Sequence, residues 1–577
     1  MPEEPEPNES TPDTPTDHDK PATAEPAATT GVLSEIKEEK SDASRASNSN
    51  PATKANREEA TPPKPTNPIR WWPLIVIVIG ATVAVIAIIA GSGDNRQKGV
   101  MMCMAVGMLA FAMSLIWLVL FSRLPTKPRL AGLAGLIGVL MAGYGLFEIK
   151  GTSGDLVPIL GWRFANDELA VPEATAKANS EVAAAAEMEG AANFVQFFGP
   201  NRDGKLSGPK LAKDWNAQPP TELWRREVGA GWSGFSVKGG LAITQEQRGD
   251  QESVVCYDLL SGEVIWSHSD EARYFTVLGG LGPRATATID GERVFSQGAT
   301  GILNCLDLQS GEKVWSVDIL KDNAASLPEW GVAGSPLILD DLVIVNPGGQ
   351  SQRSIVAYNK KSGERAWSGG SDAANWSSPV VATLAGVRQI LVFGAKGVAG
   401  HDAANGKVLW DHPWKGGHPH VSMPIAVSDK EVFVSSGYGT GAQLLEVLKS
   451  EDGSFTVERV WRSMAMKAKF ANLILLDGHV YGLDDGALAC VKVETGRRAW
   501  KGKRLGHGQV LLVGDVLLLM AEAGAVILFD PNPDEQRELT RFTALTSKTW
   551  NPPALAGEYL LVRNDKEAAC FRLPVMN

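Results

Sequence analysis

The sequence predicts an all-β fold, an eight-bladed β-propeller, preceded by a disordered N-terminal tail and an α-helical transmembrane anchor. Three observations predict it: a Gly–Trp pair recurs at fixed spacing beyond residue 220, three long uncharged runs precede it, and the first 70 residues are rich in proline and acid. A chain of 577 residues is too long for one ordinary domain of roughly 150 residues. We expect four regions: a tail (1–70), an anchor (71–148), a spacer (149–193) and the propeller (194–577).

The tail is predicted to be disordered. It holds 12 prolines, 14 Asp or Glu, 8 Lys or Arg and no aromatic residue. Such a composition buries too little apolar surface to offset the entropy lost on ordering the chain. The net charge of −11 also argues against a general nucleic-acid binder, because phosphate backbones attract basic surfaces.

The anchor contains three uncharged runs, at 71–91, 99–122 and 130–147. The first two have about the 20 residues that a helix needs to cross a bilayer, and Trp71 and Trp72 lie where an interfacial aromatic pair belongs. The third run is shorter and Gly-rich, so a buried core helix stays open as an alternative for it. We therefore expect two to three membrane helices, and a cleaved signal peptide is disfavoured because the first run starts so late.

Three crossings would place the tail and the propeller on opposite sides of the membrane. The expected membrane is the inner, cytoplasmic one, with the tail cytoplasmic and the propeller extracytoplasmic. Basic residues are more frequent on the cytoplasmic side of membrane proteins, and here the tail side has five and the propeller side four, which favours this orientation. The tail side has Lys64, Arg70, Arg123, Lys127 and Arg129, and the propeller side has Arg96, Lys98, Lys150 and Arg163. Residues 165–193 are expected to be a helical or flexible spacer.

The repeat unit is a short apolar strand, a polar turn ending in Gly, and a Trp four residues after that Gly. It occurs five times, with Trp at 266, 315, 367, 410 and 500, and Trp224 and Trp461 end two degenerate units. Successive tryptophans are 42, 49, 52, 43, 51 and 39 residues apart, the period of a four-stranded propeller blade. We expect the Asp or Asn before the turn to bond the turn's backbone, the Gly to take a positive φ, and the Trp to wedge between neighbouring sheets.

Eight inner strands complete the predicted propeller. They are expected to start near Phe235, Ala285, Ser335, Ser378, Met423, Ala471, Val510 and Pro553. The last blade has only three strands from the C-terminus, and residues 222–225 are predicted to supply its fourth. This closure leaves no free edge between the first and last blades. The five cysteines form no CxxC pair, and those in equivalent blade positions are too far apart for a disulfide.

Residues 220–577 resemble the pyrroloquinoline-quinone-like repeat propellers, whose motif runs Ala-x-Asp-x-x-Thr-Gly-x-x-x-Trp. The segment 196–204, Gln-Phe-Phe-Gly-Pro-Asn-Arg-Asp-Gly, is similar to the lead-in of many bacterial members. A WD40 propeller is the main competitor, but Trp-Asp occurs only once, at 410–411. The resemblance implies one of two classes. In quinoprotein dehydrogenases the quinone stacks between a Trp and a ring of two adjacent cysteines, beside Ca²⁺ and a catalytic Asp; in the outer-membrane assembly lipoproteins the propeller is a binding platform.

The second class is favoured here, because no two cysteines are adjacent and no matching motif places the Ca²⁺ ligands or the Asp. We expect a membrane-anchored, extracytoplasmic binding or assembly module without identifiable catalytic residues. Its partners would be the membrane, through the N-terminal helices, and a protein or small molecule at the propeller face. The alternative is a dehydrogenase of alcohols or sugars that holds pyrroloquinoline quinone with Ca²⁺ in the central channel. A third hypothesis is a sensor that signals to the tail.

Loops leading into the inner strands gather at one mouth of a propeller channel, and here each carries one aromatic or basic residue. Such a ring could stack a planar anion and hold it through Arg284, since guanidinium suits carboxylates. In the alternative, the indoles plug the channel and the cations line a solvated rim. The predicted ligand-binding ring is Trp232, Arg284, Trp330, Trp376, His420, Lys469, His507 and Trp550.

Other polar groups are expected to be structural. Glu246 and Arg248 could reach the same face but are predicted to form a surface ion pair. The acidic pairs at 340–341 and 484–485 are predicted to shape hairpin turns rather than serve as acid and base. His418 and His420 would share a face if they lie on a strand, and no metal-binding spacing such as HExxH occurs.

Overall fold

The computed structural model describes residues 68–92, 96–165, 169–173 and 193–576. Nearly all of the predicted tail and about half of the predicted spacer lie outside these residues. Three apolar helices come first: α1 (Trp72–Gly91), α2 (Arg96–Ile116), which continues into the π-helical turn η1 (Trp117–Phe121), and α3 (Thr126–Leu146). Each is long and apolar enough to cross a membrane. Apolar side chains such as Ile86 and Val139 are exposed along them, as lipid-facing residues would be.

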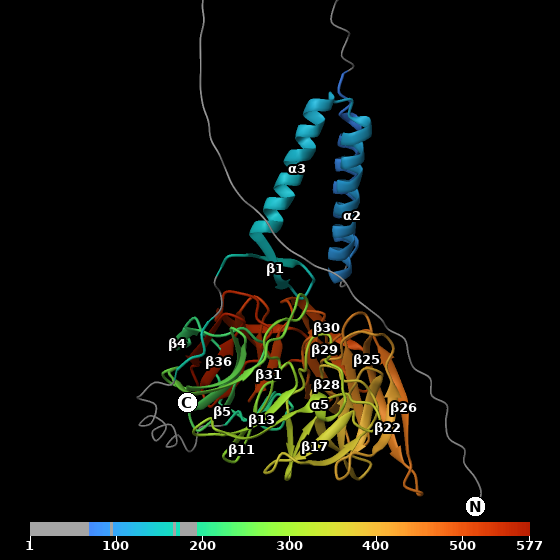
Figure 1. The fold of residues 1–577 in the computed structure, drawn as a ribbon. Coiled ribbons are helices and arrows are strands. Elements are labelled where there is room, and N and C mark those ends of the chain that lie inside the picture. The colour runs from blue at the N-terminus through green and yellow to red at the C-terminus, as the bar shows by residue number, and fades with distance from the viewer. Residues whose placement is uncertain (1–67, 93–95, 166–168, 174–192, 577) are drawn as a thin grey trace, which may run out of the picture. The chain divides into compact units, whose positions relative to one another are not determined.

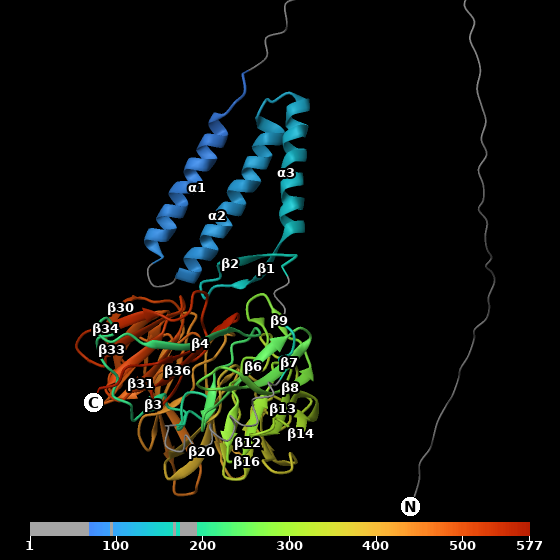
Figure 2. The ribbon, with the colours of Figure 1, turned by 90° about the vertical axis from the view of Figure 1, so that its left-hand side faces the viewer.

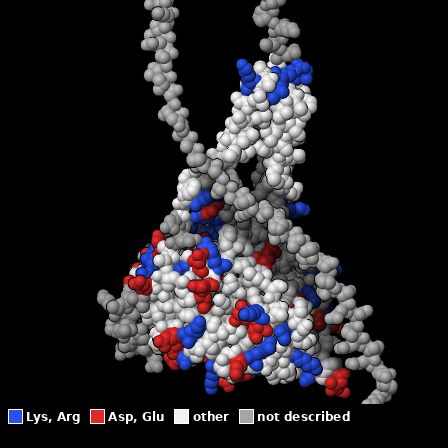
Figure 3. All heavy atoms as spheres, viewed as in Figure 1, with Lys and Arg blue, Asp and Glu red and all other residues white. Residues whose placement is uncertain are grey.

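The start of α1, the end of η1 and the start of α3 lie at the same end of the helices, and this end carries basic side chains (Figures 2 and 3). Trp71 packs on Trp117 with ring centroids 5.5 Å apart, and the Trp117 indole donates to the Arg70 carbonyl at 2.9 Å. Arg123 lies in the turn between η1 and α3, and Arg129 lies in the first turn of α3, at the same end. Figure 3 shows blue side chains gathered there and others near the opposite end of the helices.

A β-hairpin that the sequence did not predict follows α3. Its strands are β1 (Phe147–Thr152) and β2 (Pro158–Trp162), paired antiparallel. The tip between them is fixed by Ser153, whose hydroxyl accepts from the backbone N–H groups of Asp155 at 3.3 Å and Val157 at 3.2 Å. Leu156 takes a positive φ of 65° to close the turn. The hairpin therefore presents the Gly154-Asp155 dipeptide at its end.

The propeller has eight four-stranded blades, which follow one another in chain order from green through yellow to red in Figure 1. Within each blade neighbouring strands pair antiparallel, and the predicted inner strands begin within three residues of the predicted positions. Blades 1 to 4 are β5 (Ser236–Lys238), β6 (Leu241–Arg248), β7 (Gln251–Asp258), β8 (Val264–Glu271); β11 (Thr288–Asp290), β12 (Arg293–Gln297), β13 (Ile302–Asp307), β14 (Lys313–Asp318); β15 (Leu337–Leu339), β16 (Leu342–Val345), β17 (Ile355–Asn359), β18 (Arg365–Gly369); and β19 (Val380–Leu384), β20 (Val387–Phe393), β21 (Gly397–Asp402), β22 (Val408–Pro413).

Blades 5 to 8 repeat the pattern. They are β23 (Ile425–Ala426), β24 (Glu431–Ser436), β25 (Gly441–Lys449), β26 (Phe455–Ser463); β27 (Ile474–Leu476), β28 (His479–Asp484), β29 (Ala487–Lys492), β30 (Arg498–Arg504); β31 (Gln509–Val513), β32 (Val516–Met520), β33 (Ala525–Asp530), β34 (Arg537–Thr543); and β35 (Ala554–Ala556), β36 (Tyr559–Arg563), β37 (Glu567–Arg572), completed by β4 (Thr221–Glu227). Two short elements lie between blades: the hairpin β9 (Phe275–Thr276) and β10 (Gly280–Leu281), and helix α5 (Ile319–Asp322).

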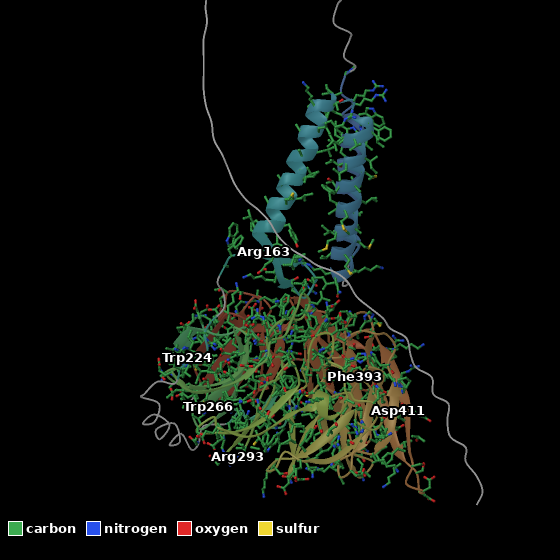
Figure 4. All side chains as sticks on the ribbon, in the orientation of Figure 1. Arg163, Trp224, Trp266, Arg293, Phe393 and Asp411 are labelled. Atoms are coloured by element: carbon green, nitrogen blue, oxygen red, sulfur yellow. The ribbon has the colours of Figure 1, made fainter. Side chains whose placement is uncertain are left out.

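The periodic Gly and Trp residues join adjacent blades, as predicted. Trp224 packs on the turn of the next blade, where a Cβ on Gly262 would run into the indole, and Gly262 has a φ of 70°. The Trp224 indole also donates to the Leu259 carbonyl at 2.8 Å, and Trp266 does the same to Leu308 at 2.9 Å (both tryptophans are labelled in Figure 4). Trp266 likewise packs on Gly311, so both of these tryptophans need a glycine in the following blade.

The predicted closure is confirmed. Strand β4 pairs with β37, placing Trp224 opposite Cys570, and green β4 lies among the red strands in Figures 1 and 2. The last blade therefore contains both ends of the domain, and the ring has no free edge.

The lead-in segment 194–206 crosses the inner strands of several blades. The Val195 carbonyl accepts from Ile289 in blade 2, and Arg202 donates to the carbonyls of Ser335 and Pro336 at 2.8 and 2.7 Å. Strand β3 (Lys205–Leu206) pairs in parallel with the last residues of β31 in blade 7. The segment thus ties together blades on different sides of the channel.

Candidate functional site

A cavity of about 140 Å³ lies in the channel, among loops that lead into the inner strands. Five members of the predicted ring line it: Trp232, Arg284, Trp330, Trp376 and Trp550. Phe470, the residue after Lys469, and Phe197 of the lead-in segment complete its aromatic wall. A cavity of about 150 Å³ holds a single benzene ring, so this one has room for one flat ring.

The four indoles form two pairs joined by Phe470. Trp330 and Trp376 have ring centroids 4.8 Å apart, and Trp232 and Trp550 are 5.0 Å apart. Phe470 lies 6.3 Å from Trp330 and 5.0 Å from Trp550. The indoles pack against one another around the cavity and leave space between them.

Arg284 supplies a positive charge with free donors. Its Nη2 donates to the carbonyls of Gly280 at 2.7 Å and Gly279 at 3.3 Å, and Tyr274 lies under its guanidinium at 4.8 Å. Its Nε and Nη1 are buried and have no hydrogen-bond partner among the described residues. Burial lowers the pKa of Arg284 to about 10, so it stays protonated at neutral pH. Glu252 interacts electrostatically with this charge but accepts no hydrogen bond from Nε or Nη1, so both donors still need an acceptor.

Trp330 carries a third free donor. Its indole N–H is buried without a partner in the described chain. The other three indoles each have an acceptor: Trp232 donates to the Gly279 carbonyl at 2.6 Å, Trp376 to the Gly331 carbonyl at 3.0 Å, and Trp550 to Glu522 at 3.0 Å. Trp330 and Arg284 both lie against Gly279: a Cβ placed there would be 3.4 Å from the Trp330 Cβ and 3.1 Å from Arg284 Nη2. The free donors therefore belong to neighbouring side chains on the cavity wall.

The other three members of the predicted ring do not line this cavity. His420 is buried and stacks on Phe393, with centroids 4.1 Å apart and planes 9° apart, while its Nδ1 lies 2.7 Å from the Gly394 carbonyl. Burial lowers the pKa of His420 to about 4, so it is neutral. Lys469 and His507 instead contact the tip of the β1–β2 hairpin.

That hairpin tip lies over the mouth of the channel. Lys469 donates to the Gly154 carbonyl at 2.6 Å, and Arg504 donates to Asp155 Oδ1 at 2.6 Å. His507 Nε2 is 3.8 Å from the same carboxylate oxygen. Sequence reasoning missed Phe470, Arg504 and the hairpin, because no local pattern shows which distant residues will meet at the mouth.

Three structural assignments made from the sequence need correction. Glu246 and Arg248 form an ion pair at 2.6 Å, but it is buried rather than at the surface, and Tyr257 donates to Glu246 at 2.6 Å. Asp485 lies in a turn as expected, whereas Asp484 ends β28, is fully buried and pairs with Lys467, Arg498 and Lys501.

The third correction concerns the histidine pair. His418 and His420 lie outside any strand, and each stacks on a different ring, Tyr438 and Phe393. Across the described residues no three His, Cys, Asp or Glu side chains come together as a metal site requires.

The cavity does not fit pyrroloquinoline quinone with Ca²⁺. Of the described residues that line it none is Asp or Glu, and hard cations such as Ca²⁺ need several oxygen ligands. Room for one ring is also too little for a fused three-ring tricarboxylate. The chemistry of the wall suits a smaller group: one flat ring that bears a carboxylate.

Comparisons with known proteins agree with the fold. Residues 250–502 match the family described as "Outer membrane protein assembly factor BamB". Quinohemoprotein alcohol dehydrogenase from Comamonas testosteroni is similar in structure, with a TM-score of 0.51, 13% identity, and coverage of 70% of this chain and 85% of that one. BamB from Moraxella catarrhalis has a TM-score of 0.45 and 16% identity, covering 62% of this chain and 99% of its own.

No curated protein matches the sequence. At these identities the structural likeness shows the fold alone. The family match covers most of the repeat region, where each of the five Gly–Trp units begins and ends between residues 250 and 502. The match over residues 250–502 is thus a similarity in the repeat region, in line with the resemblance that the spacing of Gly and Trp predicted.

Proposed function

We propose that this chain is a membrane-anchored, extracytoplasmic binding module, and that its channel cavity takes a flat ring bearing a carboxylate. The observation that carries the proposal is the set of three buried free donors on the wall, Arg284 Nε and Nη1 and Trp330 Nε1, beside stacked indoles. A carboxylate would satisfy these donors and neutralise the guanidinium, while the ring would stack on the indoles. The group can come from a small molecule or from a protein partner in an assembly.

Ligand binding is tested on the full chain in lipid nanodiscs. Benzoate is the small-molecule probe, and a short peptide in which phenylalanine precedes aspartate is the protein-borne one. A ligand that binds the native state raises its melting temperature, and the probe with the larger shift identifies the source. If neither probe shifts the melting temperature, the proposal is wrong.

Two arginines of the same blade provide a matched pair of variants. Arg284→Met removes the free donors, and we expect it to weaken benzoate binding about 10-fold or more, because hydrogen bonds to charged groups contribute about 1.5–3 kcal/mol. Arg293→Met removes an arginine at the start of β12, where it pairs with Asp307 at the edge of the propeller away from the helices (Arg293 is labelled in Figure 4). This control should bind benzoate as the wild type does.

The dehydrogenase alternative is decided in the same preparation. Pyrroloquinoline quinone with Ca²⁺ is added, and dye-linked oxidation of a panel of alcohols and sugars is followed. The cavity chemistry predicts no turnover. Sustained oxidation that depends on the quinone would favour the alternative.

Orientation in the membrane is the second part of the proposal. The three helices would span the inner membrane, with the tail in the cytoplasm and the propeller outside it. The basic side chains Arg70, Arg123, Lys127 and Arg129 lie at the end of the helices that this orientation places on the cytoplasmic side. Protease added to cells with a permeabilised outer envelope should digest the propeller. Digestion of the tail with protection of the propeller would reverse the topology.

A further inference from the structure

The β1–β2 hairpin reaches residues of several blades at the channel mouth. The hairpin contacts Lys469 before blade 6, Arg504 at the end of blade 6 and His507 before blade 7. Lys548 before blade 8 donates to the Thr152 carbonyl at 3.1 Å. On the other side, Gly151 lies near the Val277 carbonyl in the loop that joins β9 to β10. The same loop contributes Leu278 and Gly279 to the cavity wall. The hairpin therefore spans the mouth from blade 6 to the connection between blades 1 and 2.

The tip is complementary to the mouth in charge and in shape. Asp155 is 14% exposed and faces Arg504 at 2.6 Å, Arg96 at 3.5 Å and His507 at 3.8 Å. Burial alone would raise the pKa of Asp155, but the hydrogen bond from His507 and the charge of Arg504 bring it below its usual value. At Gly154 a Cβ would overlap the His507 ring, so only glycine fits.

Two side chains connect the tip to the cavity wall. Glu522 Oε1 accepts from the Gly154 N–H at 2.9 Å and from the Trp550 indole at 3.0 Å. Lys548, which holds Thr152, lies over the rings of Trp550 and Trp232 at 4.3 and 4.5 Å. Both tryptophans line the cavity, so displacement of the tip removes contacts from its wall.

The hairpin is also continuous with the membrane helices. Strand β1 begins at the residue after α3 ends, and Gln97 of α2 accepts from Lys469 at 2.7 Å. A change at the mouth can therefore be transmitted to α2 and α3 without any intervening segment.

We propose that the hairpin tip is a reversible latch over the channel mouth, held by Asp155, which slows entry of the ligand into the cavity and links its binding to the membrane helices. The ligand part of this inference rests on the proposed function; the docking of the tip does not. Release of the tip would open the mouth, and a ligand that displaces it would free α2 and α3 from the propeller.

The test uses the full chain in nanodiscs and two matched variants in the hairpin. Asp155→Asn removes the charge that Arg504 holds. Glu148→Gln makes the same chemical change in β1, where the side chain is exposed. Hydrogen exchange at Gly154 reports docking directly, because its N–H is bonded to Glu522 of the propeller.

We expect exchange at Gly154 to be about 10-fold faster or more in Asp155→Asn and unchanged in Glu148→Gln. Equal exchange in all three proteins would overturn the latch, whether or not benzoate binds. Stopped-flow tryptophan fluorescence then measures benzoate entry, which should be faster in Asp155→Asn only. Equal entry rates would overturn the gating role and leave the proposed function intact. Absence of benzoate binding in every protein would refute the proposed function and, with it, the gating role.

Discussion

Trp330 and Trp376 are in contact at a tilt of 33°, and the indole N–H of Trp330 is free whereas that of Trp376 is bonded. This difference gives a sharp prediction. Replacing each by phenylalanine removes the N–H and keeps one aromatic ring at the 4.8 Å contact. In Trp376→Phe the Gly331 carbonyl loses its donor. In Trp330→Phe no described acceptor loses a partner, and a buried unsatisfied N–H disappears.

The two substitutions should therefore differ in stability. Trp376→Phe loses a hydrogen bond of about 0.5–1.5 kcal/mol and about 1 kcal/mol of apolar burial, so we expect the free energy of unfolding to fall by about 2 kcal/mol. In Trp330→Phe the same loss of burial is offset, since leaving a buried donor unsatisfied costs about 1–3 kcal/mol. Its stability should change by less than about 1 kcal/mol.

Their effects on ligand binding should be reversed. If Trp330 donates to the carboxylate, Trp330→Phe weakens benzoate binding about 10-fold or more, because a hydrogen bond to a charged group contributes about 1.5–3 kcal/mol. Trp376→Phe should bind benzoate within about 3-fold of the wild type, since its N–H points at the protein. Thermal unfolding and benzoate titration, both followed by fluorescence, measure the two quantities. Equal losses of affinity in the two variants, or a larger loss of stability in Trp330→Phe, would refute the reasoning.

Further predictions concern the blades and a buried acid. Trp266→Ala should lower the free energy of unfolding by about 3–5 kcal/mol in chemical denaturation, because the indole is buried between two blades and donates to the Leu308 carbonyl. The control Trp72→Ala, outside the propeller, should leave the unfolding transition of the propeller unchanged. Burial raises the pKa of Glu252 from 4.5 to about 7. The folded state thus binds a proton more tightly than the unfolded state, so this contribution to stability is complete below pH 4.5 and is lost as the pH rises through 7. Between pH 4.5 and 8 the melting temperature should fall less steeply in Glu252→Gln than in the wild type. Parallel profiles of melting temperature against pH in the two proteins would contradict the raised pKa of Glu252.

The propeller could be predicted because its determinants are local and repeated. Gly262 closes a turn and also seats Trp224 of the neighbouring blade, so one short motif encodes both the hairpin and the packing between blades. The eighth blade was predictable as well, since its three C-terminal strands require a partner and residues 222–225 form a strand just before the first repeat unit.

The site was predictable only in part. Five ring members follow from their positions in the loops before the inner strands, and these five line the cavity. His420 occupies an equivalent loop, but stacking on Phe393 takes it away from the cavity, a contact that spacing does not encode. The hairpin latch depends on Asp155 and Arg504, which are 349 residues apart in the sequence.

The central claim is that the cavity recognises a flat ring through its carboxylate. Isothermal titration of the full chain in nanodiscs with benzoate, benzamide and benzamidinium tests it directly, because the three ligands share a ring and differ in charge. The free donors of Arg284 and Trp330 predict that benzoate binds at least about 10-fold more tightly than benzamide and that benzamidinium does not bind. Equal affinities for the three ligands, or tighter binding of benzamidinium, would contradict the account.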